Sequence, residues 1–202
     1  PKGGNRRRTD RLNCTAPEDP TCRGNTQPEQ QRLARMVADM LLLAKTERGV
    51  DLPHKERFMA ADEAQALLDF YEAVADDKGI RLTVQGNGSI EGDRLMFRRA
   101  LSNLLSNALR HAPAGGSVRI VLAERPDGTE VSVENAGEDI DPQMLPRLFD
   151  RFYRADPARA HPTSDGAGLG LAITKAIVEA HGGQASVTSA QGLTRFTLMF
   201  PL

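Results

Sequence analysis

Asn103-Leu-Leu-Ser-Asn107-Ala-Leu-Arg110-His111 lies inside a segment whose apolar residues recur at helical spacing. On a helix, Asn103, Asn107 and either Arg110 or His111 share one face, because residues four and seven or eight apart lie above one another. An asparagine oxygen can coordinate Mg²⁺ among phosphate oxygens, and a nearby cation can neutralise phosphate. Surface asparagines that bond to the local backbone are the alternative. This segment alone does not distinguish a phosphate and Mg²⁺ site from surface asparagines, so the neighbouring motifs are needed.

A second informative stretch, Asp165-Gly166-Ala-Gly168-Leu169-Gly170-Leu171, stands directly before another apolar-periodic segment. Glycines there would let backbone N–H groups and a helix N-terminus face an anion, although a hinge or tight turn would use the same residues. No strand leads directly into the stretch, and it lacks a Gly-Lys-Ser/Thr ending. It therefore fits neither the dinucleotide-binding template nor the Walker loop, and nucleoside-phosphate binding would use another arrangement.

Two shorter stretches lie between these motifs. Val133-Glu-Asn135-Ala-Gly137 predicts a strand running into a turn, where an amide could meet the edge of a base and Gly137 would let the ring approach. A plain strand-to-loop turn would also suit this sequence. Leu148-Phe-Asp-Arg-Phe-Tyr-Arg154 combines aromatic and basic residues. Its phenylalanines suit a core as well as a ligand, whereas Arg154 suits a phosphate.

The surrounding pattern predicts one domain of sheet and helices. Helices are expected at residues 61–78, 93–111, 143–149 and 169–180, and strands at 80–84, 118–122, 130–133, 184–188 and 194–200. Asp93 is a favourable N-cap, and Asp127-Gly128 predicts a hairpin turn. Because the elements do not form a regular βαβ series, we expect an α+β fold, a mixed sheet with helices on one face.

The N-terminal part predicts a different organisation. Residues 1–28 combine glycines, prolines and a basic cluster without apolar periodicity, which favours a disordered arm. Residues 29–48 carry an apolar helical face, also compatible with a heptad seam, that needs a partner helix. Residues 49–56 predict a linker, and residues 57–202 the α+β domain.

Composition excludes several classes of protein. Apolar residues make up 40% of the 202 residues and charged residues 26%, and the formal net charge of -1 predicts no bulk attraction to nucleic acid. Cys14 and Cys22 fit neither a disulfide framework nor a four-ligand zinc site. No apolar run approaches the ~20 residues that span a bilayer, and no signal peptide opens the chain, so we expect a cytoplasmic location.

The stretches NLLSNALRH, VENAG, LFDRFYR and DGAGLGLAI, in this order and spacing, resemble the N, G1, F and G2 boxes of sensor histidine kinases. The segments DFYEAVADDKGI and GDRLMFRRALSNLLSNALRHAP are especially similar to the heavy-metal (copper and silver) kinases of two-component systems. The resemblance implies the Bergerat-type ATP-binding sandwich, shared with gyrase B, with a mobile lid between Asp150 and Gly170. It also implies that residues 29–48 form the second helix of a partial dimerisation hairpin.

By motif position, the resemblance implies that ATP and Mg²⁺ are the cofactors. Asn107 would hold Mg²⁺, Arg110 and His111 would approach the phosphates, and Asn135 would face the adenine amino group. The other implied ATP-binding positions are Asn103, Gly137, Arg154, Gly166, Gly168, Leu169, Gly170 and Leu171. One departure is visible in the usual G1 pattern Asp-x-Gly-x-Gly, where Asn135 replaces the Asp and Asp139 the second Gly. An amide can still accept from an amino group.

The implied activity is transfer of the γ-phosphoryl group of ATP to a protein histidine. Hydrolytic relatives of this fold carry Glu where this chain has Asn103, and an amide cannot act as a base toward water, so transfer is expected rather than hydrolysis. An anti-sigma type serine kinase on the same fold would want Glu at position 103.

The phosphate acceptor is the open question of the sequence. The family's acceptor histidine opens a motif like His-Glu-x-x-Thr-Pro, and no such setting surrounds the four histidines, His54, His111, His161 and His181. The expected partners are therefore a response regulator or an acceptor-bearing kinase hairpin, with a homodimer through residues 29–48. A nucleotide-binding module without kinase activity is the alternative. The family is anchored in the bacterial inner membrane by other segments.

Overall fold

The computed structural model describes residues 33–34, 36–41, 43–44, 54–154 and 168–202. The predicted N-terminal arm, both cysteines, residues 49–53 of the predicted linker, His161 and Gly166 lie outside the described residues. The chain divides into two units, and the sheets and long helices all belong to the second, Met36–Leu202.

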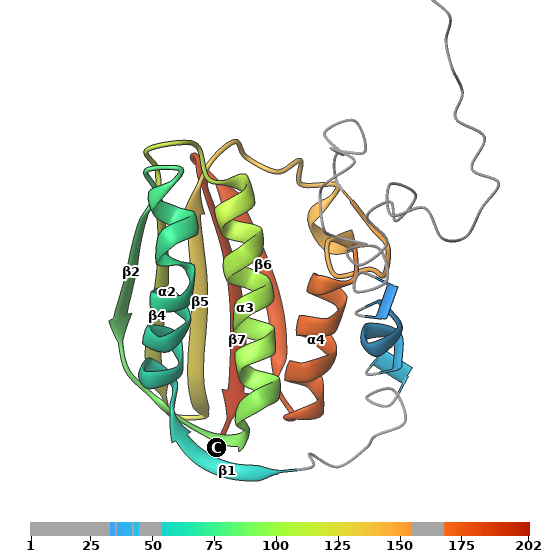
Figure 1. Cartoon of the computed structure of the whole chain (residues 1–202). Coiled ribbons are helices and arrows are strands. Elements are labelled where there is room, and N and C mark those ends of the chain that lie inside the picture. The colour runs from blue at the N-terminus through green and yellow to red at the C-terminus, as the bar shows by residue number, and fades with distance from the viewer. Residues whose placement is uncertain (1–32, 35, 42, 45–53, 155–167) are drawn as a thin grey trace, which may run out of the picture. The chain divides into compact units, whose positions relative to one another are not determined.

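A mixed five-stranded sheet forms the centre of this unit (Figure 1). Its strands, in spatial order, are β2 (Arg81–Gly86), β4 (Ser117–Arg125), β5 (Gly128–Ala136), β7 (Leu193–Pro201) and β6 (Gln184–Ala190). Strand β2 pairs with β4 in parallel, whereas every other neighbouring pair is antiparallel. The alternation of buried and exposed residues along β4 and β7 gives the sheet one apolar face.

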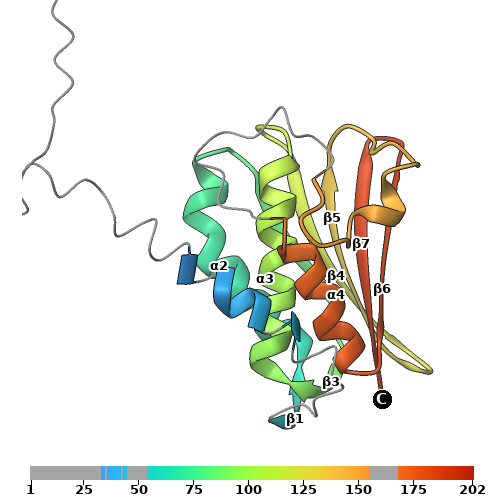
Figure 2. The same cartoon turned by 90° about the vertical axis from the view of Figure 1, so that its right-hand side faces the viewer.

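Three helices cover that apolar face, α2 (Ala60–Asp76), α3 (Arg94–His111) and α4 (Gly170–Ala180), as Figures 1 and 2 show. The predicted α+β fold, a mixed sheet with helices on one face, is thereby confirmed. Helix α3 begins where predicted, because the Asp93 side chain accepts a hydrogen bond from the Met96 N–H at 2.9 Å. Its buried face, centred on Leu101, Leu104 and Leu105, packs into the middle of the core.

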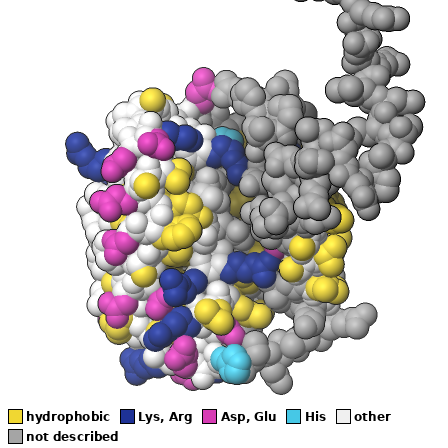
Figure 3. Space-filling model, viewed as in Figure 1, with side chains coloured by type: hydrophobic (Ala, Val, Ile, Leu, Met, Phe, Trp, Pro, Cys, Tyr) yellow, Lys and Arg dark blue, Asp and Glu magenta, His cyan; other side chains and the backbone are white. Residues whose placement is uncertain are grey.

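Ion pairs join the N-terminal ends of α2 and α3. The buried carboxylate of Glu63 lies 3.5 Å from Arg94 and 3.2 Å from Arg98. In Figure 3, acidic side chains line the side of the molecule formed by α2, and basic side chains lie at both the upper and the lower part of the same face. Because the arginines are paired with carboxylates, this face is a mixed-charge surface rather than a basic one.

The structure corrects three predictions from the sequence. A two-stranded antiparallel sheet of β1 (Lys55–Met59) and β3 (Ser89–Asp93) was not predicted, and β1 crosses the expected boundary between residues 56 and 57. The turn between β4 and β5 lies at residues 126–127, not 127–128, because Arg125 already pairs with Gly128. The expected helix at residues 143–149 is only the 3₁₀ turn η2 (Leu145–Arg147).

The described residues of the predicted N-terminal helix, 33–34, 36–41 and 43–44, are helical. Leu43 is buried, and Asp39 forms an ion pair with Arg99 of α3. Val37, Met40 and Leu41 are exposed, so the helix leaves a second apolar face uncovered within the described part of the chain. None of the described helices combines the length and the apolar character needed to cross a membrane.

Candidate functional site

The second half of α3 presents the first predicted site residues. Asn103 and Asn107 are half-buried at the edge of the helix, beside the fully buried Leu104 and Leu105, while Arg110 and His111 are exposed in its last turn. This arrangement follows from helical periodicity, because residues adjacent in sequence to the buried stripe lie at its margin. The Asn107 amide has no hydrogen-bond partner among the described residues.

The start of α4 meets this part of α3. The Asn103 Nδ2 atom donates to the Gly170 carbonyl oxygen at 3.0 Å, across 67 residues of sequence. The Thr174 hydroxyl donates to the same oxygen at 3.0 Å. A Cβ on Gly170 would lie 3.7 Å from Asn103 Cγ, so the two segments are in van der Waals contact. The described start of the glycine-rich stretch therefore lies against the asparagine-bearing part of α3.

The end of β5 brings in the third motif. Asn135 is 4% exposed, and its Nδ2 atom donates to the Ala136 carbonyl oxygen at 3.1 Å. A Cβ on Gly137 would lie 3.3 Å from the His111 carbonyl oxygen and 3.6 Å from Asn135 Nδ2. The end of β5 therefore lies close to the C-terminal end of α3 at Gly137.

The fourth motif ends beside the described start of the glycine-rich stretch. Phe152 has a φ of 62° and Gly168 a φ of 71°, and the Phe152 N–H donates to the Gly168 carbonyl oxygen at 2.9 Å. A left-handed backbone at an exposed phenylalanine is a strained conformation, which structures retain mainly at functional positions. Arg154, two residues further on, is half-buried.

Two threonines beside these residues were not predicted from the sequence. Thr174 is fully buried and bonds to the same carbonyl as Asn103. Thr194 is 5% exposed, pairs in register with Asn135, and lies 2.8 Å from the Ser189 hydroxyl. The alternation along β7 places Thr194 in phase with the buried Phe196, which was the one available sequence signal for an inward polar residue.

The charges of the described site residues are mainly positive. Arg110, in the last turn of α3, and Arg154 supply cations, and no described group of three or more His, Cys, Asp or Glu residues could hold a metal ion by itself. A neutral asparagine oxygen suits a metal that is already bound to phosphate oxygens. The half-buried Asn107 amide fits this requirement, because no described residue occupies its oxygen.

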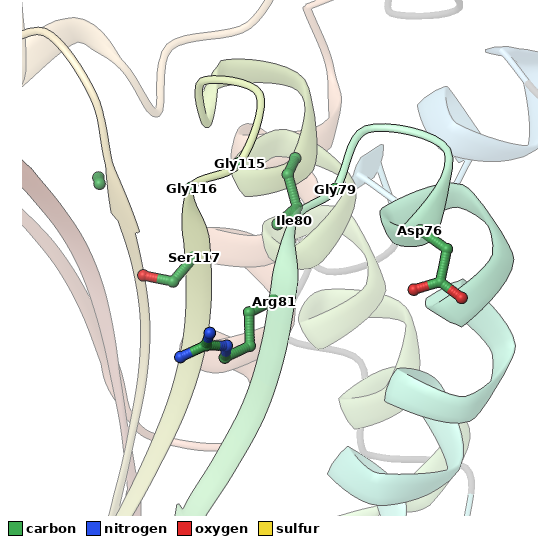
Figure 4. Close-up of a pocket in the computed structure, with 8 residues that line it drawn as sticks. Asp76, Gly79, Ile80, Arg81, Gly115, Gly116 and Ser117 are labelled. Atoms are coloured by element: carbon green, nitrogen blue, oxygen red, sulfur yellow. The ribbon is translucent and has the colours of Figure 1, made fainter.

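A pocket of about 600 Å³ lies elsewhere, at the upper end of β2 and β4 (Figure 4). Residues Asp76, Gly79, Ile80, Arg81, Gly115, Gly116, Ser117 and Ala136 line it. Ala136 points to the opposite side of β5 from Asn135, because side chains alternate along a strand. None of the predicted site residues lines this pocket, so it is not the site formed by the motifs.

The fold and the meeting of the four motifs define an ATPase-type domain of the kind found in histidine kinases. Residues 92–202 match the family described as histidine kinase-, DNA gyrase B-, and HSP90-like ATPase, and the chain belongs to this family. The resemblance to sensor histidine kinases that the motifs indicated is thereby confirmed.

Individual relatives agree with this assignment. The chain is 47% identical over 174 residues to the sensor histidine kinase CusS of Escherichia coli (strain K12), which covers 86% of this chain and 36% of CusS. The structure of the mycobacterial sensor histidine kinase MprB is similar at 30% identity and a TM-score of 0.62, covering 73% of this chain and 97% of that chain. Histidine kinase ThkA, solved in complex with response regulator protein TrrA, shares the fold at 19% identity and a TM-score of 0.68, covering 91% of this chain and 52% of ThkA. The chain spans about a third of the length of CusS, at 36%.

Proposed function

We propose that this chain binds Mg–ATP between the second half of α3, the end of β5 and the start of α4, and transfers the γ-phosphoryl group to a protein histidine in two-component signalling. The observation that carries the proposal is the hydrogen bond from Asn103 to the Gly170 carbonyl oxygen, which joins two phosphate-binding motifs that lie 67 residues apart. Membership of the ATPase family supports nucleotide binding.

Asn135 is the residue we assign to the adenine base. Its Nδ2 atom is engaged by the Ala136 carbonyl oxygen, which leaves Oδ1 as the atom that accepts. An acceptor at this place favours a base with an exocyclic amino group, such as adenine, over one that presents a carbonyl. Gly137 would let the ring approach the backbone.

The phosphates are assigned to the C-terminal turn of α3 and the N-terminal turn of α4. Arg110, His111 and Arg154 would approach them, the two arginines as cations, and the backbone at Gly168 and Gly170 would contribute N–H groups at a helix N-terminus. Gly166 belongs to the same assignment, although it lies outside the described residues. Leu169 is 2% exposed, so it would contribute only its backbone, whereas Leu171 is half-buried.

Asn107 would hold Mg²⁺ through its side-chain oxygen, together with phosphate oxygens. When bound, Mg²⁺ would offset the negative charge of the phosphates. The side chains of the protein would determine whether the phosphoryl group is transferred to a protein or to water. Asn103 donates to Gly170 and, as an amide, cannot deprotonate water. The site therefore suits transfer to a protein side chain better than hydrolysis.

The acceptor and the partners belong to the same proposal. Among the described histidines, His54, His111 and His181, none opens a motif like His-Glu-x-x-Thr-Pro, and His181 is held by two backbone groups. We therefore assign the acceptor to a kinase hairpin, with residues 29–48 as one helix of a dimer, and a response regulator as the next protein in the sequence. The ThkA–TrrA complex supports a response-regulator partner. ATP is available in the cytoplasm, where this domain would act.

The test is incubation of the chain with γ-labelled ATP and Mg²⁺, alone and with an acceptor-bearing hairpin of a sensor kinase. Acid-labile label should appear on the hairpin, and the Asn107→Ala chain should give much less label at the same ATP concentration. Binding of ATP without label on any protein would instead identify a nucleotide-binding module without kinase activity. Rapid steady-state hydrolysis by the chain alone would contradict the transfer mechanism.

A further inference from the structure

The carboxylate of Asp139 reaches from the loop after β5 to the turn between β6 and β7. Its Oδ1 atom accepts from the Gly192 N–H at 2.8 Å, and its Oδ2 atom accepts from the Gln191 N–H at 3.0 Å. Both donors are backbone groups, and both bonds are charge-assisted, which makes them stronger than neutral ones. One side chain thereby joins two segments about fifty residues apart, at sequence separations of 52 and 53.

The turn that Asp139 holds has an unfavourable residue. Ala190 and Leu193 form the last pair of the β6–β7 ladder, so Gln191 and Gly192 are the two residues of the turn. Their φ angles are 56° and 76°, which is the pattern of a type I′ hairpin turn. Asn or Gly is preferred at the first of these positions, and Gln is not. The two hydrogen bonds to Asp139 compensate for this choice of residue.

Further hydrogen bonds fix the same two segments to each other. The Gly137 N–H donates to the Gly192 carbonyl oxygen at 3.0 Å, so both backbone groups of Gly192 bond to the loop. The Ile140 N–H donates to the Ser189 hydroxyl oxygen at 2.9 Å. The loop is thus attached on both sides of Asp139, and its first attached residue, Gly137, lies against Asn135 and the end of α3.

We propose that Asp139 is a positioning residue for the nucleotide base. It does not contact the base itself; it holds the turn against the loop, and the turn holds Gly137 against Asn135 and the end of α3. The usual G1 pattern, Asp-x-Gly-x-Gly, has a carboxylate at the place of Asn135. In this chain a carboxylate stands at position 139 instead, where it holds the loop in place and does not bind the base. This inference rests on the proposed function, since it concerns the same nucleotide site. A site ordered before binding gains affinity because less ordering remains to be done.

The first experiment compares Mg–ATP affinity, by calorimetry on the full chain, for the native protein, Asp139→Ala and Asp141→Ala. Asp141 is the matched control, because its carboxylate accepts from one backbone N–H of its own loop, that of Gln143 at 2.9 Å, and does not reach the turn. We expect affinity about tenfold weaker for Asp139→Ala, as for loss of preorganisation, and unchanged for Asp141→Ala. Equal affinities in all three proteins would overturn the proposal.

A second variant separates positioning from a general loss of stability. Gln191→Gly suits the left-handed turn without help from Asp139. Added to Asp139→Ala, it should recover most of the lost affinity and restore slow hydrogen exchange at the Gly137 amide, which Asp139→Ala should accelerate. Lost affinity without faster exchange at Gly137, or without recovery in the double variant, contradicts the positioning role. Failure of the native chain to bind ATP would refute the proposed function itself, which is a different result from normal binding by Asp139→Ala.

Discussion

Asn107 is the single residue whose chemistry most depends on a bound metal. Replacing it with Ala removes the proposed oxygen ligand but no hydrogen bond to a described residue, so we expect little change in the free energy of unfolding. Affinity for ATP with Mg²⁺ should fall about tenfold, or about 1.4 kcal/mol. Affinity measured with EDTA in place of Mg²⁺ should differ much less. The measurement is calorimetric titration under both conditions.

The control for Asn107 is Ser106→Ala. Ser106 is also half-buried on α3, but its hydroxyl donates to the Asn103 carbonyl oxygen at 3.1 Å, within the helix. This variant should bind Mg–ATP as the native chain does. An equal loss of affinity with and without Mg²⁺ in Asn107→Ala would mean that Asn107 contacts the nucleotide itself and does not coordinate the metal.

His181 gives the fold a dependence on pH. Burial lowers the pKa of its imidazole, although the Ile177 carbonyl oxygen, which accepts from Nδ1, and the Asp93 carboxylate act to raise that pKa, and Lys55 acts to lower it. Nε2 accepts from the Asp93 N–H at 3.0 Å, a bond that only the neutral ring can form. The folded protein therefore favours the unprotonated ring.

The sign of the effect follows from proton binding. As pH falls through 6.5, the ordinary value for histidine, the unfolded chain binds a proton at position 181 before the folded chain does. The free energy of unfolding should therefore decrease as pH is lowered. Urea unfolding at about pH 7.5 and about pH 5.5 should show a larger decrease for the native chain than for His181→Gln. The same decrease in both proteins would assign the pH dependence to other groups.

At the scale of elements, the contact between residues 152–153 and Gly168 fixes the geometry at the start of α4. A Cβ on Gly168 would lie 2.9 Å from the Phe152 carbonyl carbon and 3.1 Å from the Tyr153 carbonyl oxygen, and the φ of 71° disfavours any side chain. Gly168→Ala should therefore destabilise the protein by about 2 kcal/mol and weaken ATP binding. Thermal unfolding and ATP titration would measure the two effects.

Gly115→Ala is the comparison for Gly168→Ala. Gly115 has a similar φ of 74°, but a Cβ there would meet nothing within 4 Å. This variant should show only the backbone cost, about 1 kcal/mol, and no change in ATP affinity. If Gly168→Ala and Gly115→Ala lower the free energy of unfolding by the same amount, the steric contact at Gly168 does not contribute to the destabilisation.

The helices and strands also show how much of this fold could be predicted from the sequence. The helices and the five main strands were predictable, because their periodicity is local and caps such as Asp93 mark their ends. Strands β1 and β3 were not, because each is short and the pair is specified only by contacts between distant residues, such as Phe58 opposite Ile90. The turn after β4 was placed one residue late, because the register of a hairpin depends on pairs that a dipeptide does not reveal.

The candidate site, like the fold, could be predicted from the sequence only in part. Asn103, Asn135 and Gly170 could be identified from local residue type and spacing. The bonds that join them could not: Thr174 acts on a carbonyl of its own helix that Asn103 also reaches, and Asp139 reaches a turn more than fifty residues away. Local patterns therefore predicted the candidate residues, whereas the hydrogen bonds that connect them became visible only in the folded chain.

At the scale of the whole molecule, four rings link elements from both sheets. Phe97 of α3 lies 5.2 Å from Phe58 of β1 and 5.4 Å from Phe200 of β7, and Phe200 lies 5.4 Å from His181 after α4, each distance between ring centroids. Edge-on and tilted contacts of this kind add to the burial of the rings. Phe97 is completely buried and is the ring that joins the small sheet to the large one.

Replacing Phe97 with Ala should therefore affect the whole fold and not one element. A buried Phe→Ala change costs about 3–5 kcal/mol, a large part of the roughly 5–15 kcal/mol that stabilises a typical domain. Phe70→Ala is the matched control, because Phe70 is 75% exposed on α2 and should cost less than about 0.5 kcal/mol. Urea unfolding followed by circular dichroism and by hydrogen exchange in β1 and α4 would measure both. If exchange in Phe97→Ala rises in β1 alone while α4 stays protected, the rings do not couple the two sheets, and the small sheet is an independent unit.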